Sequence, residues 1–192
     1  MDKEIFHLGI ITSFIYTVVY IAKDNIIVEW NYIKNIYFQK EICNILDMIF
    51  EKYNISFAGL FLGPAPLMSC RTTLIFMQGL YIALKIPIVL LSGNNHYKYK
   101  SIDIVIIQNF CGNYLVMEAG KKQKKVTLLE IESRDYFNKK VGLVSREGHS
   151  ININSNYISV LFPNIENLIK EAFKKYKNNK VIKTFSQIVP FF

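Results

Sequence analysis

The sequence predicts an α/β fold with a mixed sheet, and three features of the chain lead to this expectation. Short apolar runs rich in β-branched residues alternate with helical patterns. Three of these runs come first and are joined by short turns, which favours an antiparallel meander. Hydrophobic residues make up 51% of the 192 residues, so the chain can bury a sizeable core. The expected order is β-β-β-α-β-α-β, followed by a smaller second part.

Turn residues and apolar spacing divide the first part into its elements. The first helix carries apolar residues at helical spacing, which form one face: Ile42, Ile45, Leu46, Ile49 and Phe50. The second helix is expected at 71–84 with Ser69 as its N-cap, and it is apolar on almost every side. Such a helix lies deep in a core or is covered by a partner. The strands are expected at 5–11, 15–22, 26–30, 57–62 and 88–91.

The polar stretch 93–101 separates the second part of the chain from the first. We expect residues 1–92 to form one lobe, 93–101 a connection, and 102–192 a second, smaller lobe. In the second lobe, 102–108 and 114–117 read as a hairpin around Cys111-Gly112-Asn113. Further strands are expected at 126–132 and 141–145. A last helix opens after Pro163 and carries lysines near its end, where cations suit the helix dipole.

The net charge of +8 is unevenly distributed along the chain. Residues 121–192 carry 14 Lys and Arg against 6 Asp and Glu, whereas the first 120 residues are balanced. The excess indicates either a solvated lysine-rich surface or an anionic partner, such as RNA or an acidic protein face.

The cysteines and histidines give no pattern for a metal site or a disulfide frame. Cys43, Cys70 and Cys111 lack C-x-x-C spacing, and the three histidines are scattered. The uncharged stretch 8–22 is short for a membrane span and follows no basic segment. We therefore expect no metal and no membrane association, and a cytoplasmic protein.

The loop "GPAPLMSC" before the second helix is a poor candidate for binding phosphate. A phosphate-binding loop needs several glycines with convergent N–H groups, but this one has one glycine and two prolines. Arg71 is expected to pin the loop, although a contact to an anion stays open. An actin-like phosphotransferase would need an acidic residue at the end of the first strand, where Ile11 stands. No catalytic residues are expected.

Several motifs resemble those of the TsaB (YeaZ) family. The strand "LGIITS" at 8–13 is similar to the family pattern "LAIDTS". The family's "GPGSFTGLRIG" and the helix and strand after it match without a gap at Gly63, Pro64, Arg71, Gly79, Leu80, Ala83, Leu84, Ile86, Pro87 and Ser92. Three features depart from the pattern: the family Asp is Ile11, the loop core is replaced at 65–69, and the family Lys is Gln78.

The resemblance implies an actin-like ATPase (ribonuclease H-like) fold, with the C-terminal helix returning to the first lobe. It implies a non-catalytic subunit that activates a TsaD-like partner, which transfers a threonylcarbamoyl group to the tRNA adenosine next to the anticodon. The implied partner interface consists of Ile42, Leu46 and Ile49 on the first helix and Arg71, Phe76, Leu80 and Tyr81 on the second. The family's loop motif falls on Gly63, Pro64, Ser69 and Arg71.

The resemblance also bears on ligands and on alternative functions. It implies no cofactor in the isolated chain, ATP or ADP only at a partner interface, and only indirect contact with tRNA. Self-association through the same helices stays open, as does burial of the second helix in the chain's own core. Two other functions are considered: an independent actin-like phosphotransferase with 63–73 near phosphate, and an RNA-binding accessory protein acting through its basic last third.

Overall fold

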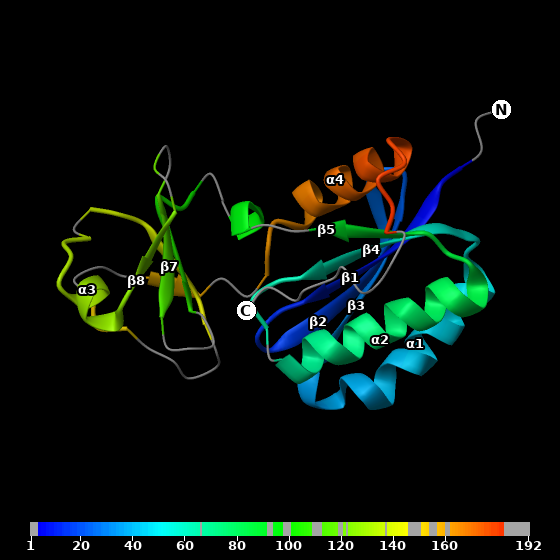
Figure 1. Ribbon diagram of the computed structural model, residues 1–192, viewed down its shortest axis with the longest axis horizontal. Helices are drawn as coiled ribbons and strands as arrows, with labels where there is room; N and C mark the ends of the chain where they lie inside the picture. Colours follow the sequence, from blue (N-terminus) through cyan, green and yellow to red (C-terminus); the bar gives the residue numbers. More distant parts are fainter. Residues whose placement is uncertain are drawn as a thin grey trace. The chain divides into compact units, whose positions relative to one another are not determined.

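The computed structural model describes residues 4–65, 67–91, 94–97, 101–108, 113–118, 121, 123–136, 138–145, 151–153, 157–159 and 162–182. It confirms the α/β class, with two five-stranded mixed sheets and helices (Figure 1). The chain divides into two compact units, with the boundaries after residue 93 and before Ile165. The first unit contains the N-terminal part and the last helix, and the second contains the part between them.

The first unit has the predicted β-β-β-α-β-α-β order. Its elements are β1 (Phe6–Thr12), β2 (Tyr16–Lys23), β3 (Ile26–Lys34), the 3-10 turn η1 (Asn35–Tyr37), α1 (Phe38–Lys52), β4 (Ile55–Leu62), α2 (Leu67–Leu84), β5 (Ile88–Leu91) and α4 (Ile165–Lys177). The sheet order is β3-β2-β1-β4-β5. β1 pairs antiparallel with β2 and parallel with β4, so the first strand lies at the centre.

Helices cover both faces of this sheet. α1 and α2 lie on one face, and α4 packs over β4 and β5 on the other (Figure 1). Strands buried on both faces carry apolar residues at nearly every position, as in "FHLGIIT" of β1 and "ISFAGLFL" of β4. The main core lies between the sheet and the helix pair, and it includes Leu8, Ile10, Ala58 and Leu60.

The second unit repeats the strand arrangement of the first. Its elements are η2 (Asn94–Tyr97), β6 (Ile104–Gln108), β7 (Tyr114–Glu118), β8 (Lys124–Val126), α3 (Leu128–Glu132), β9 (Val141–Val144) and β10 (Tyr157–Ser159). The sheet order is β8-β7-β6-β9-β10, with β6 antiparallel to β7 and parallel to β9. In each unit a central first strand is flanked by the rest of a meander on one side and by parallel strands on the other.

Two predicted elements differ from the structure, and one observed strand was not predicted. The segment 126–132 was expected as a strand, but β8 ends at Val126 and α3 follows. A capping box starts this helix, since Thr127 Oγ1 accepts from Glu130 N–H (3.3 Å) and the Glu130 carboxylate accepts from Thr127 N–H (2.7 Å). α2 begins at Leu67, so Ser69 lies inside the helix and is not its N-cap. β10 was not predicted.

The hairpin β6–β7 is confirmed as an antiparallel pair. Cys111 and Gly112 of its loop lie outside the described residues, as does Ser92 of the family pattern.

Candidate partner-binding face

The first-helix residues of the expected interface face the chain's own sheet. Ile42, Leu46 and Ile49 are at most 5% exposed and belong to the main core. Their spacing turns one side of α1 toward the sheet, so the periodicity that singled them out reflects burial within the chain. A partner docking on this fold would meet other side chains of α1 first.

The second-helix residues of the expected interface lie between the core and the surface. Phe76, Leu80 and Tyr81 are half-buried and pack against the core. The Phe76 ring meets the Phe38 ring of α1 edge-on, with centroids 5.9 Å apart. These three side chains help to join α2 to the rest of the unit, and their contact with a partner stays a prediction.

A row of exposed residues runs along the outer side of α2. Met68, Ile75 and Ile82 are 63%, 67% and 58% exposed, and they follow each other at seven-residue intervals. Thr72 and Gly79 fall between them, so the row has the alternating spacing of four and three residues that marks a coiled-coil seam. We call these five residues the α2 seam. A Cβ atom added at Gly79 would have no neighbour within 4 Å, so the seam is open there.

Polar side chains border the α2 seam. The outer side of α1 carries four exposed polar residues: Lys40, Asn44, Asp47 and Glu51. Gln39 of α1, which is also exposed, donates from Nε2 to Thr72 Oγ1 at 3.5 Å and so joins α1 to the seam. Arg71 and Gln78 are exposed on the other side of it. An apolar row with a polar border is typical of protein contact surfaces.

The loop before α2 is held by groups other than the predicted arginine. Arg71 is exposed and forms no hydrogen bond or ion pair with any residue that the structure describes, so its expected pinning role is not observed. Instead, the buried Cys70 thiol lies 3.9 Å from the Ala65 carbonyl oxygen, in a weak hydrogen bond. Burial raises the pKa of Cys70 to about 11, so this thiol stays neutral. Gly63 and Ser69 are buried as well, and Pro64 is half-buried.

The end of β1 is closed by a hydroxyl pair. Thr12 Oγ1 and Thr73 Oγ1 lie 3.0 Å apart and are buried, which joins β1 to the first turns of α2. Ile11, at the position of the family aspartate, is 1% exposed. Beyond it, Asn35 Nδ2 donates to the Ser13 carbonyl oxygen at 2.8 Å. Asn35 Oδ1 also accepts from Thr17 Oγ1 at 2.9 Å, so the polar groups that close this end are neutral.

The described ranges contain no group of three His, Cys, Asp or Glu side chains that could hold a metal ion. Within the same ranges, no helix has both the length and the apolar character needed to cross a bilayer.

Sequence reasoning did not select Met68, Ile75 or Ile82. Their seven-residue spacing is visible in the sequence, but it is obscured by apolar residues on the other sides of α2. Exposure in the folded chain separates the seam from the buried sides.

The duplicated strand order places the chain in the actin-like fold class, as the resemblance implied. In particular, the fold is that of YeaZ from Pseudomonas aeruginosa, whose solved structure matches with a TM-score of 0.68 and 13% identity, over 98% of this chain and 99% of that one. An uncharacterized protein described as similar to the peptidase YeaZ from Pseudomonas aeruginosa matches with a TM-score of 0.64 and 14% identity, over 98% and 99%. No protein-family model and no curated protein matches the sequence. At these identities the likeness establishes the fold alone.

Proposed function

We propose that the chain is a non-catalytic scaffold subunit that binds and activates a TsaD-like enzyme. The complex would transfer a threonylcarbamoyl group to the tRNA adenosine next to the anticodon. The observation that carries the proposal is the exposed α2 seam on a chain with the YeaZ fold. The sequence motifs at 8–13 and 63–92 support the same family.

The chemistry of the seam suits another helix as the partner. Large side chains at Met68, Ile75 and Ile82 can enter the gaps of a facing helix, while Thr72 and Gly79 leave room for its own side chains. Three large apolar side chains are exposed in a row, and they gain hydrophobic stabilisation only if a partner covers them. A second copy of the chain could use the same seam when the partner is absent.

The neutral groups at the end of β1 support a role without catalysis. Phosphoryl transfer in this fold class relies on carboxylates that organise Mg²⁺ and the attacking group. In this chain, Ile11 and the pair of Thr12 and Thr73 occupy the corresponding region. We therefore propose that the ATP or ADP used in the transfer reaction binds only at the junction with the partner, that the modified adenosine of tRNA is reached through the partner, and that the protein is cytoplasmic.

Co-purification with the cell's TsaD-type protein tests the seam. Ile75→Lys places a charge in the middle of the seam, at a side chain that is already 67% exposed, so the fold should tolerate it. We expect this variant to lose the partner. Phe76 is a poorer choice because a charge there would disrupt its packing on Phe38.

The matched control is Leu129→Lys on α3, which makes the same kind of change at a side chain that is 78% exposed. It should retain the partner. Equal recovery of the partner with both variants would contradict the proposed interface, and so would failure of the unmodified chain to bind it.

A further inference from the structure

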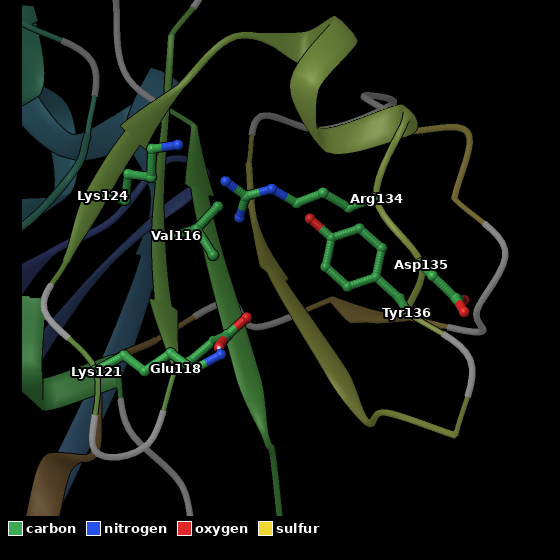
Figure 2. A pocket seen from close by; sticks show the side chains of 7 residues that line it. All are labelled: Val116, Glu118, Lys121, Lys124, Arg134, Asp135 and Tyr136. Atoms are coloured by element: carbon green, nitrogen blue, oxygen red, sulfur yellow. Dashed lines mark ion pairs between the residues drawn. The ribbon is translucent and has the colours of Figure 1, made fainter.

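The second unit contains a hollow of about 420 Å³ next to β7 and β8. Figure 2 shows the side chains that line it, which come from these two strands, from the turn between them, and from the segment after α3. Val116 and Tyr136 are buried and form part of the unit's core. The hollow therefore has a packed base, unlike a row of lysines on an open surface.

The strand register places a lysine beside this base. Lys124 of β8 is the cross-strand neighbour of Val116 of β7, so the two side chains point to the same face of the sheet. Arg134 approaches from the opposite wall, and its guanidinium extends toward the strands next to the Tyr136 ring (Figure 2). A primary amine and a guanidinium thus share one hollow.

Two carboxylates line the hollow besides this pair, and neither is directed at it alone. Lys121 forms an ion pair with Glu118 and neutralises it. The Asp135 carboxylate points away from the hollow (Figure 2). Glu118 is paired and Asp135 points outward, so the carboxylates of the lining offset the charge of Lys124 and Arg134 only in part.

Lys124 and Arg134 have little ion pairing of their own. Lys124 lies 3.9 Å from Glu130, with the two side chains 64% and 47% exposed, so this pair is weak. The Glu130 carboxylate already accepts two hydrogen bonds from Thr127. Arg134 is half-buried, and within the described residues no carboxylate oxygen lies within 4.0 Å of its guanidinium. Its charge nevertheless helps to lower the pKa of Glu130 and acts on the Tyr136 hydroxyl beside it.

We infer that this hollow binds a phosphate group through Lys124 and Arg134. The planar guanidinium can hold two phosphate oxygens at once, and the lysine adds a second charge-assisted hydrogen bond. The phosphate belongs either to an RNA backbone or to a free nucleotide. Only the RNA source rests on the proposed function in tRNA modification; recognition of phosphate rests on the hollow itself.

Fluorescence anisotropy with a labelled tRNA transcript and the full chain, without any partner protein, tests the inference. We expect Lys124→Gln and Arg134→Gln each to weaken binding about tenfold and to lower the salt dependence by about one counterion. Arg134→Lys keeps the charge and should retain part of the affinity. Circular dichroism of each variant confirms that the fold is intact.

Lys125→Gln is the matched control because Lys125 is the next residue of β8 and points to the opposite face of the strand. It should change binding less than twofold. An equal loss with Lys125→Gln and Lys124→Gln would overturn the inference, because the lysines would then act as a diffuse basic surface.

Titration with pyrophosphate distinguishes the two sources. Displacement of tRNA by pyrophosphate in the unmodified chain, but not in Arg134→Gln, supports an RNA phosphate in the hollow. Pyrophosphate binding that depends on Arg134 without any tRNA binding assigns the hollow to a small phosphate ligand, such as a free nucleotide. Binding of neither probe at low salt would overturn the inference, and the α2 seam would be unaffected by that result.

Discussion

Gly9 and Tyr20 face each other on β1 and β2 at a position where the chain has no room for a side chain. A Cβ atom at Gly9 would overlap the phenol ring of Tyr20, which is buried and lies across the glycine. Gly59 of β4 is the neighbour of Gly9 on the other side, but a Cβ atom there would make ordinary contacts of 3.4 and 3.5 Å.

We expect Gly9→Ala to destabilise the chain by about 2–3 kcal/mol, because the tyrosine ring or the strand must move. Gly59→Ala should cost less than half as much. Urea denaturation measures both. If the tyrosine ring is the cause, the cost of Gly9→Ala should shrink in a Tyr20→Ala background; an unchanged cost would contradict this account.

His7 is enclosed by aromatic rings on the α4 side of the sheet. Its imidazole stacks on Phe57 at 4.6 Å and meets Tyr20 edge-on at 5.8 Å. Neither ring nitrogen of His7 has a hydrogen-bond partner among the described residues. Burial therefore lowers the pKa of His7 to about 4 from its usual 6.5, and the ring is neutral in the folded chain.

This burial makes stability depend on pH in a defined range. As the pH falls from 6.5 toward 4, the unfolded chain gains a proton on His7 before the folded chain does. Above pH 6.5 His7 therefore leaves the free energy of unfolding unchanged. As the pH drops toward 4, the free energy of unfolding falls by about 3 kcal/mol in total. We expect His7→Phe to flatten the pH dependence of the unfolding free energy in this range. Identical slopes for the two proteins would contradict the prediction.

At the scale of elements, α2 has to meet two requirements. Its inner side packs on the sheet through Thr73 and Met77, while its outer side carries the seam. Gly79 lowers the helix propensity of α2, although a Cβ atom there would meet no other part of the chain within 4 Å. Its presence is explained if a partner helix approaches closely there.

Two substitutions at Gly79 should therefore show separate effects on stability and on association. Because alanine is the better helix former, we expect the isolated chain to gain about 0.5–1 kcal/mol in unfolding free energy. Gly79→Leu should weaken partner binding because its side chain would fill the gap in the seam. Thermal unfolding and a pull-down measure the two effects; full binding by Gly79→Leu would argue against close helix packing at this point.

The sequence predicted elements where one pattern dominated. In α1, the spacing of Ile42, Leu46 and Ile49 gave both the helix and its buried side. In α3, apolar and β-branched residues favoured a strand, but the segment forms a helix whose start is stabilised by the capping box of Thr127 and Glu130.

The outer side of α2 could not be predicted from composition. An almost uniformly apolar helix has no sequence signal that tells its buried side from its exposed side. Packing against the sheet determines which side of α2 is buried, since Thr73 is enclosed and Ile75 stays exposed.

At the scale of the whole molecule, the two sheets share one strand order although no repeat is visible in the sequence. A given strand order depends on strand length, turns and the apolar pattern. Two segments without sequence similarity can therefore form the same strand order. The same freedom explains how the fold of YeaZ persists at 13% identity. Functional surfaces have to be located residue by residue on such a scaffold, as with the α2 seam and the basic hollow.

In the proposed complex, a partner helix covers the α2 seam. Two methionines allow a direct test, since Met68 lies in the seam and Met48 is 58% exposed on α1 outside it. Hydroxyl-radical footprinting of the chain, alone and with the TsaD-type protein, compares their rates of oxidation. We expect complex formation to slow the oxidation of Met68 and to leave that of Met48 unchanged. Protection of Met48 with no protection of Met68 would contradict it.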